Sequence, residues 1–462
     1  MNRKKFLENA ALAVPGVLTA NSLLGNSFSS TNTKKKLSHT YFGKNKIRLT
    51  ISETETEIAK GLIFKTIAYN NSVPGPVIRM KEGEETIVEV INNTDHQEVV
   101  HWHGQEIPAE VDGALEEGTP PIEPHSKRTY KFKPGPAGVK WYHTHAMTQG
   151  DKQKAMYSGQ IGIVYIEPKD GKRQYKTAYD RELFFITHDW KYFLQGALFK
   201  DFDRLVYTVN GKSLGFDSPI KVKEGEKILL HFVNGNARDD IRFSCSGHKM
   251  KILGLDGRPV PKPDYVNDIK LGSGERADIL VEMNNPGKWI FGDPDEERRK
   301  GGLGFVVEYP DQKGDPKWEV DSFGNRWDYS LFSIEPKKTK PKNEITVEIK
   351  RYETENGTLY KVNGKPFEEQ EDPIPLKYGE DYRIHFYNSN IKSHPLHLHR
   401  HYFELVNVEG KEMSGIMKDT VFVNKNSYAA VDLKATQKGL ALFHCHKQNH
   451  MEEGFMALFE TI

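Results

Sequence analysis

Cysteine is almost absent from this chain of 462 residues, which contains only Cys245 and Cys445. Two cysteines exclude a small scaffold that is held together by several disulfides. The fold must therefore rely on hydrophobic cores. One disulfide between the two residues is the plain alternative to two free thiols. Because Cys445 lies between two histidines in a spacing typical of metal ligands, we interpret it as a ligand and Cys245 as an ordinary buried thiol.

The chain also lacks an excess of charge of either sign. Its 65 Lys and Arg residues face 64 Asp and Glu residues, which leaves a net charge of +1. A protein that binds nucleic acid or an anionic membrane usually has a basic surface, so we expect neither partner. Long apolar runs are missing as well, except at the N-terminus, and no pattern in the sequence indicates an oligomeric state.

The N-terminal run begins after the basic stretch Arg3-Lys4-Lys5, is rich in alanine and ends near Leu24. A basic start followed by a short apolar run is typical of a signal peptide. The stretch Arg3-Lys4-x-Phe6-Leu7 resembles a twin-arginine signal with Lys in place of the second Arg, so the Tat and Sec routes both stay open. We expect residues 1–36 to be a signal peptide and disordered leader, and the mature protein to be exported to the periplasm.

Two short motifs occur three times in the same order. In the first motif, a Gly precedes an Asn by nine residues, and the residues between them alternate as in a strand. In the second, a Gly precedes the first residue of a closing triplet by five residues. The first motif pairs Gly83 with Asn92, Gly225 with Asn234, and Gly379 with Asn388; the second pairs Gly138 with His143, Gly287 with Gly292, and Gly439 with His444.

The repeated order of motifs predicts three homologous domains, at residues 37–168, 175–315 and 325–462. Short strands between Gly and Pro turns favour all-β sandwiches. The middle copy has Gly292 and Pro294 where the other two copies have histidines. We therefore expect the second domain to contain no metal ligands at this position and to act as a spacer or shape element.

Ten of the 18 histidines fall in four clusters near the two ends of the chain. On a strand, His-x-His places both rings on one face, where each can reach a different metal of one compact cluster. Around Cys445 the same alternation turns the thiol to one side and its two neighbouring rings to the other. Thiolate and imidazole together suit copper, so the pattern predicts a metal enzyme with two linked copper sites. The clusters are His101 and His103; His143 and His145; His394, His397 and His399; and His444, Cys445, His446 and His450.

These clusters resemble the four copper motifs of the multicopper oxidases, in the order of that family. The motifs are His-x-His-Gly at 101–104, His-x-His at 143–145, His-x-x-His-x-His at 394–399 and His-Cys-His-x-x-x-His at 444–450. The resemblance extends from about Lys46 to the C-terminus and points to the three-domain, laccase-like branch. It implies three cupredoxin-like Greek-key β-sandwich domains and four Cu ions: one type 1, one type 2 and two type 3.

Transferred position by position, the resemblance also implies the ligands of each ion. His394, Cys445 and His450 would hold the type 1 copper, and His101 and His397 the type 2 copper. One type 3 copper would be held by His103, His143 and His446, and the other by His145, His399 and His444. This distribution requires the first and third domains to meet.

Three further positions follow from the resemblance. The axial position of the type 1 site is Phe455, since Met456 is one residue too far and should face the opposite side of the strand. A non-ligating Phe predicts a raised reduction potential. Asp112 matches the family's acid beside the type 2 copper and is a candidate proton donor, although a turn residue before Gly113 is the alternative. Some bacterial relatives have a second acid after the last type 1 His, where this chain has Met451 followed by Glu452.

The resemblance implies a laccase-like oxidase that takes electrons from small phenolic or aromatic reductants and passes them to O2, which becomes water. Cys445 and His450 would carry the electrons and Asp112 the protons. The alternative is a periplasmic cuprous oxidase for copper tolerance, which would be expected to use a methionine-rich segment. The sequence has ten Met residues without such a segment; Met413 and Met417 are the nearest to one. A copper carrier without catalysis is disfavoured, because it would need only one site.

Overall fold

The computed structural model describes residues 46–148, 154–191, 205–319, 324–336, 341–355 and 357–462. The predicted signal peptide and leader, residues 1–36, lie outside these ranges. None of the helices in the described ranges has the length and apolar composition needed to cross a membrane. The described chain forms six β-sheets, which pair into three sandwiches.

Domain 1 is a sandwich of two four-stranded sheets with the orders β2-β1-β4-β6 and β3-β8-β7-β5. Residues along β1 alternate between buried and less buried, because successive side chains of a strand face opposite sides. The elements are β1 (Lys46–Ala59), β2 (Leu62–Tyr69), β3 (Ile78–Lys81), β4 (Thr86–Asn92), β5 (Val100–His101), α2 (Ala109–Asp112), η1 (Leu115–Glu117), β6 (Lys127–Phe132), β7 (Gly138–Thr144), η2 (Ala155–Tyr157) and β8 (Ile161–Glu167).

Domain 2 pairs a six-stranded sheet, β10-β9-β12-β17-β14-β15, with a five-stranded sheet, β11-β19-β18-β13-β16. Cys245 is buried in the core of this sandwich as a free thiol. The elements are β9 (Arg181–Lys191), β10 (Leu205–Val209), β11 (Ile220–Lys221), β12 (Lys227–Asn234), β13 (Ile241–Cys245), β14 (Met250–Leu255), β15 (Arg258–Val266), β16 (Ile269–Leu271), β17 (Arg276–Glu282), β18 (Lys288–Gly292), α3 (Glu296–Lys300) and β19 (Gly304–Glu308).

Domain 3 repeats the strand arrangement of domain 2, with the orders β21-β20-β23-β28-β25-β26 and β22-β30-β29-β24-β27. The elements are η5 (Tyr329–Phe332), β20 (Asn343–Thr354), β21 (Gly357–Val362), η6 (Phe367–Glu369), β22 (Ile374–Leu376), β23 (Asp381–Asn388), β24 (His394–Leu398), β25 (Phe403–Val408), β26 (Lys411–Lys418), β27 (Thr420–Val423), β28 (Ser427–Lys434), β29 (Gly439–Cys445), α4 (Gln448–Glu452) and β30 (Met456–Thr461).

The first sequence motif has the same structural role in all three domains. Its glycines, Gly83, Gly225 and Gly379, have φ between 73° and 82° and precede β4, β12 and β23. The three asparagines that end these strands are buried, and each side-chain amide donates to backbone carbonyls of neighbouring loops. Such an amide satisfies carbonyl groups that water cannot reach, which explains why the motif recurs. The prediction of an all-β chain with three related sandwich domains is confirmed.

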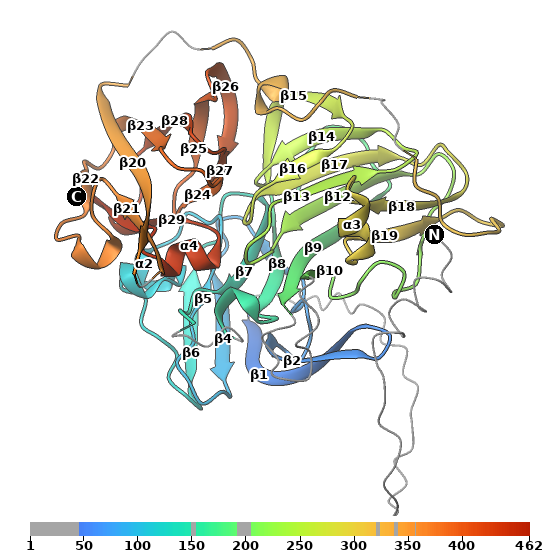
Figure 1. Cartoon of the computed structure of the whole chain (residues 1–462), viewed down its shortest axis with the longest axis horizontal. Coiled ribbons are helices and arrows are strands. Elements are labelled where there is room, and N and C mark those ends of the chain that lie inside the picture. Colours follow the sequence, from blue (N-terminus) through green and yellow to red (C-terminus); the bar gives the residue numbers. More distant parts are fainter. Residues whose placement is uncertain (1–45, 149–153, 192–204, 320–323, 337–340, 356) are drawn as a thin grey trace, which may run out of the picture.

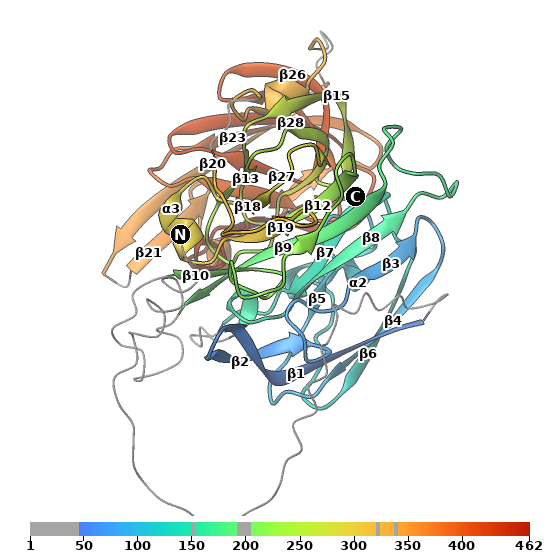
Figure 2. The ribbon, with the colours of Figure 1, turned by 90° about the vertical axis from the view of Figure 1, so that its right-hand side faces the viewer.

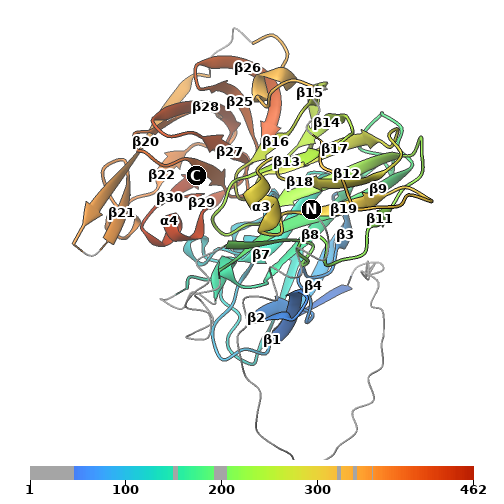
Figure 3. The same ribbon diagram turned by 45° about the vertical axis from the view of Figure 1, so that its right-hand side comes forward.

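The domains are arranged so that each contacts the other two. Figure 1 shows domain 3, in orange and red, beside domain 2, in green and yellow, with domain 1 in blue and cyan below both. Figures 2 and 3 show β7 and β8 of domain 1 running close under β9 of domain 2. Trp141 and Ile163 of domain 1 pack there against Ile186 and Val233 of domain 2. The helix α4 and strand β29 lie next to α2, η1 and η2 of domain 1.

A buried histidine connects domains 1 and 2. The Nδ1 atom of His231 lies 2.5 Å from Asp278 Oδ1, and its Nε2 atom lies 3.5 Å from Glu182 Oε2. Glu182 forms an ion pair with Arg79 of domain 1, and the Phe184 ring is stacked 4.7 Å from the imidazole. Burial disfavours the imidazolium, but the two carboxylates more than offset that effect and raise the pKa of His231 to about 9.

We expect His231→Gln to destabilise the protein in a pH-dependent way. The folded-state pKa exceeds the unfolded value of about 6.5, so the stabilisation is complete below that pH and is lost as pH rises through 9. Its pH-dependent part is on the order of 3 kcal/mol. Denaturant unfolding of wild type and variant at about pH 6 and about pH 9.5 checks this.

His188→Gln is the matched control, because His188 is equally buried in domain 2 and burial lowers its pKa to about 4. Since the folded-state pKa of His188 lies below the unfolded value, its contribution to stability rises slightly from about pH 6 to about pH 9.5, opposite in sign to the change expected for His231→Gln. A stability difference for His231→Gln that stays constant over this range would contradict the proposed charge on His231.

Candidate metal centre

Cys445 and two histidines form a compact group inside domain 3. His394 Nδ1 lies 3.3 Å and His450 Nδ1 3.4 Å from Cys445 Sγ, and the two nitrogens are 3.0 Å apart. β24 pairs antiparallel with β29, which brings His394 beside Cys445, and the single turn of α4 returns His450 to the same side. Two imidazole nitrogens and one sulfur therefore form a triangle, the arrangement that blue copper sites use. Cys445 is a free thiol, so the alternative disulfide with Cys245 is not formed.

The surroundings of this triangle are apolar on one side and close to solvent on the other. Phe455 is fully buried, and its ring lies 4.9 Å from the His394 ring. Met456 instead packs with Ala114 and Leu442, away from the sulfur. Among all the candidate ligands His450 is the most exposed, at 7 %. Solvent-borne molecules therefore have their shortest approach at the edge of His450.

The other eight histidines of the clusters meet in a second pocket, between domains 1 and 3. The His101 ring stacks on His399 at 3.9 Å, and the His103 ring stacks on His397 at 3.8 Å. Strand pairing explains the meeting within each domain, since His101 lies opposite His143, and His397 lies opposite His444. The eight rings are those of His101, His103, His143, His145, His397, His399, His444 and His446, and all of them are buried.

Hydrogen bonds on the outside of this pocket orient most of the rings. The Nδ1 atom of His101 contacts the Asp112 carbonyl oxygen at 3.0 Å, and that of His397 contacts the Asp419 carbonyl oxygen at 2.9 Å. His143 and His444 use Nδ1 in the same way, toward backbone oxygens at 2.8 and 2.9 Å. A ring that donates through Nδ1 presents Nε2 as a free lone pair to the pocket interior.

The ring nitrogens that face inward are better placed to bind metal ions than to hydrogen-bond to one another. His399 Nε2 and His444 Nε2 are 3.0 Å apart, and His103 Nδ1 and His446 Nε2 are 3.2 Å apart. Within the described ranges, the Nε2 atoms of His101, His143, His145 and His397 are buried without any hydrogen-bond partner. Buried polar atoms without partners are costly, so the convergence of several such atoms indicates room for cations. Groups of three possible ligands occur at His101, His397 and His399, and at His145, His399 and His444.

The electrostatics of the histidine pocket favour metal binding. Burial, reinforced by the neighbouring histidines, holds the pKa values of His143 and His145 well below the usual range, and it lowers that of His444 to about 3. The rings are therefore neutral, as metal ligands must be. Burial raises the pKa of the Cys445 thiol to about 12, so a thiolate at this position needs a bound cation. The donor set of thiolate and imidazoles fits copper.

Two buried acids lie at the edge of the histidine pocket. Asp112 Oδ2 lies 2.8 Å from His399 Nδ1 and 3.2 Å from His101 Nδ1. Asp112 also precedes the turn at Gly113, where φ is 104° and a side chain would collide with the Val100 carbonyl. Asp112 therefore lies both at this turn and beside two candidate ligands, and its role as a proton donor stays a prediction.

Glu117, which sequence reasoning missed, is the second acid. Its Oε1 atom lies 3.1 Å from His399 Nδ1 and accepts the backbone N–H of Leu442 at 2.5 Å. Burial and the neighbouring Asp112 raise the pKa of Glu117 well above its usual range. In the sequence, Glu116-Glu117 looks like an exposed acidic turn, and only the contact of η1 with β29 shows that one of the two is buried.

Glu452 has a different environment. Its Oε1 atom accepts hydrogen bonds from the Thr148 backbone N–H at 3.0 Å and from the Gln448 side chain at 2.9 Å. These bonds tie α4 to the end of domain 1 and do not reach the eight histidines. Met413 and Met417, the nearest approach to a methionine cluster in the sequence, lie on β26, where Met413 is a core residue of domain 3.

Comparisons with known proteins agree with this geometry. Three family models described as multicopper oxidase match residues 50–171, 188–299 and 336–462. The chain is 26 % identical over 442 residues to multicopper oxidase MmcO of Mycobacterium tuberculosis, with 87 % of this chain and 84 % of that protein covered. It is 24 % identical to copper resistance protein A of Escherichia coli, with 98 % of each covered.

The fold is also similar to those of solved structures. The L499M mutant of the laccase from B. aclada superposes with a TM-score of 0.75 at 20 % identity, covering 90 % of this chain and 87 % of that one. The multicopper oxidase from Campylobacter jejuni, described as a metallo-oxidase, superposes with a TM-score of 0.71 at 22 % identity, covering 96 % and 94 %. At these identities the likeness concerns the fold alone.

Proposed function

Since this chain belongs to the multicopper oxidases, we propose that it is a laccase-like oxidase. It would couple the one-electron oxidation of small phenolic or aromatic donors to the four-electron reduction of O2 to water. One observation carries the proposal: Cys445 belongs to the trigonal group with His394 and His450, while the adjacent His444 and His446 belong to the histidine pocket. A single stretch of backbone thus joins an electron-accepting site to a site with room for several ions.

The proposed ligand assignment follows the family motifs, and two of its ligand sets are supported by the close grouping of their ligand atoms: His394 with Cys445 and His450, and His145 with His399 and His444. His394, Cys445 and His450 would hold the type 1 copper, and His101 and His397 the type 2 copper. His103, His143 and His446 would hold one type 3 copper, and His145, His399 and His444 the other. When bound, the type 1 copper accepts electrons singly from the donor, and the other three ions supply the centre at which O2 is reduced.

The protein's own groups support donor access and proton supply. His450 is the most exposed of the candidate ligands, so a donor can approach the site at the edge of its ring, which packs on its inner side against the buried Tyr360 ring at 4.8 Å. Asp112 lies within hydrogen-bond distance of two candidate ligands and would deliver protons from its carboxyl group. Residues 1–36 support export to the periplasm, which fractionation of the host cell checks.

A cuprous oxidase for copper tolerance is the second candidate, and one structural observation favours it. Met147 of domain 1 packs with Met451 and Met456 of domain 3 in one apolar cluster at α4, the helix that carries His450. Thioether sulfur is a soft ligand that suits Cu(I). The fold therefore brings Met147 to a pair of methionines that are close in sequence, and one relative is named copper resistance protein A.

Oxygen uptake with a panel of donors separates the two candidates. We expect the copper-loaded chain to contain about four Cu and to consume O2 with phenols and an aromatic amine. The Cys445→Ser variant, which lacks the thiolate, should remain inactive with every donor. Preferential turnover of Cu(I) over all organic donors would replace the laccase-like assignment with the cuprous oxidase.

We expect Phe455→Met to lower the reduction potential of the blue copper by about 60 mV or more. For a one-electron couple, this shift means that the site binds the oxidised ion about tenfold more tightly relative to the reduced ion than before. The reason is that a thioether near the Cys445 sulfur can approach the metal, whereas the buried phenyl ring cannot ligate it. Redox titration of the blue absorption measures the potential. Phe459→Met, in the same core but away from the ligands, is the control. An unchanged potential in Phe455→Met would contradict the axial assignment.

We expect Asp112→Asn to reduce kcat by about 100-fold or more, because an amide cannot donate the proton that a carboxyl group supplies. The blue colour should persist, since Asp112 contacts the histidine pocket and not Cys445. Steady-state O2 uptake with a phenol measures the effect. Asp95→Asn, an exposed position paired with His125, serves as the control. Wild-type turnover in Asp112→Asn would leave only the turn role for this residue.

A further inference from the structure

Domain 2 reaches the histidine pocket through the turn between β16 and β17. The turn is Gly272-Ser273-Gly274-Glu275, and Arg276 follows as the first residue of β17. Gly274 has φ of 87°, and a Cβ atom there would lie 2.8 Å from His446 Cδ2 and 3.2 Å from His103 Cε1. Only a glycine therefore lets this turn approach the two rings so closely. The sequence predicts domain 2 to be a spacer or shape element without ligands at Gly292, and this turn shows that it also contacts the histidine pocket.

Ser273 fixes the tautomer of His446. Its hydroxyl group donates to the Asn236 carbonyl oxygen, with Oγ and O 2.5 Å apart. Because that bond uses the hydroxyl proton, Ser273 Oγ accepts from His446 Nδ1, which lies 3.0 Å away. With its proton on Nδ1, His446 presents the Nε2 lone pair to the pocket, 3.2 Å from His103 Nδ1.

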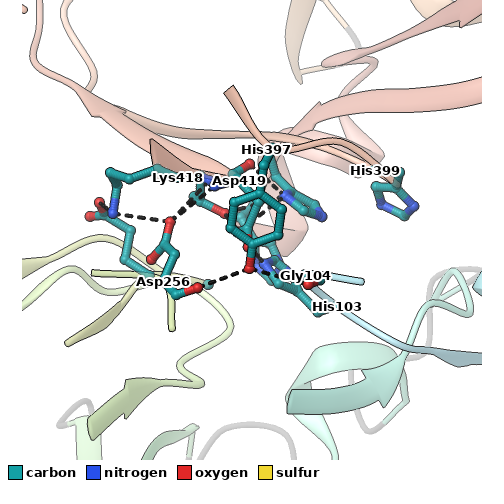
Figure 4. Close-up of polar contacts among 12 residues, drawn as sticks. His103, Gly104, Asp256, His397, His399, Lys418 and Asp419 are labelled. Carbon is teal, nitrogen blue, oxygen red and sulfur yellow. Dashed lines mark hydrogen bonds and ion pairs between the residues drawn. The ribbon is translucent and has the colours of Figure 1, made fainter. Parts of the chain in front are cut away.

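Arg276 acts on His103 through a carboxylate of domain 3. The guanidinium is fully buried and makes two parallel hydrogen bonds to Asp419, at 2.6 Å to Oδ1 and 2.5 Å to Oδ2. Asp419 Oδ1 in turn lies 3.1 Å from His103 Nε2. A carboxylate held in this way accepts the Nε2 proton, so His103 presents Nδ1 to the pocket. Figure 4 shows Asp419 next to His397, with His103 below them in the view.

Further buried ion pairs hold this segment of domain 3 on domain 2. Asp256 Oδ2 lies 3.0 Å from Lys418 Nζ and accepts the backbone N–H groups of Asp419 at 3.3 Å and Thr420 at 3.2 Å. Lys418 Nζ also lies 3.0 Å from Glu275 Oε1 (Figure 4 shows Lys418 beside Asp256). Charges buried this deeply require partners in good geometry, so the segment has little freedom to move.

We propose that domain 2 sets the orientation and tautomer of His446 and His103, with Ser273 and Arg276 as the positioning residues. The inference rests on the proposed function, because it assigns both rings to copper. Groups that orient a ligand typically change metal affinity by about 10- to 100-fold when they are replaced. The triangle of His394, Cys445 and His450 receives no contact from Ser273 or Arg276, so its copper provides an internal reference.

The test compares Ser273→Ala with Ser213→Ala, a control in which another buried serine of domain 2 loses a hydroxyl that donates to a backbone oxygen. Both variants are loaded with copper and dialysed against graded concentrations of a chelator. Metal analysis gives the copper content, the blue absorption reports the Cys445 site, and electron paramagnetic resonance and near-ultraviolet absorption report the histidine pocket. We expect Ser273→Ala to lose its pocket copper at a chelator concentration about 10-fold lower than Ser213→Ala does. The blue absorption should be retained in both variants.

Arg276→Lys provides an independent second variant. Lysine keeps the charge but cannot make two parallel bonds, so we expect a loss of pocket copper of about 10- to 100-fold in affinity with the blue site intact. The inference would be overturned if Ser273→Ala and Arg276→Lys retained pocket copper as firmly as Ser213→Ala does. It would also be overturned if the blue absorption and the pocket signals were lost together. A wild-type chain whose pocket binds no copper would instead contradict the proposed function.

Discussion

The pleat of β29 is the constraint on which the rest of the structure depends. Successive side chains of a strand face opposite sides, so Cys445 and its neighbours His444 and His446 cannot enter the same site. The two sites must then lie on opposite sides of one sheet, separated only by backbone. One side is completed within domain 3 by His394 and α4, while the other side needs imidazoles from elsewhere.

Those imidazoles come from domain 1, which makes the pocket a product of domain assembly. His101 stacks on His399, and His103 stacks on His397, so neither domain alone has a complete set of rings. Eight imidazoles buried together leave inward ring nitrogens without partners, which costs free energy unless cations bind. Folding of the interface and binding of metal are therefore coupled, since ions that bind only the assembled pocket stabilise it by mass action.

Sequence reasoning succeeded where the relevant contacts are local or repeat with a fixed spacing. The Gly and Asn pairs of the three domains and the separate directions of Phe455 and Met456 follow from strand periodicity. Only the first histidine of each His-x-His pair lies on a strand, because β5, β7 and β24 end at His101, Thr144 and Leu398. It failed where contacts join distant segments. Asp419 and Arg276 are 143 residues apart, and Glu117 meets the backbone of Leu442 across 325 residues. No spacing rule links such pairs, because their proximity is set by how whole sandwiches pack.

The contrast between domains 2 and 3 shows how one framework serves two roles. Their sheets have the same strand order, and Gly292 occupies the place at the end of β18 that His444 occupies in β29. A Cβ atom on Gly292 would lie 2.7 Å from the Leu303 carbonyl oxygen, so no ligand side chain fits there without movement of the backbone. The next residue, Asp293, accepts the backbone N–H groups of Arg242 and Asp295 and so joins two loops. Domain 2 acts on the metal pocket from a different edge, through the turn before β17, where hydrogen bonds to rings replace direct ligation. A sandwich without ligands can thus still determine which nitrogen of a ligand faces the metal.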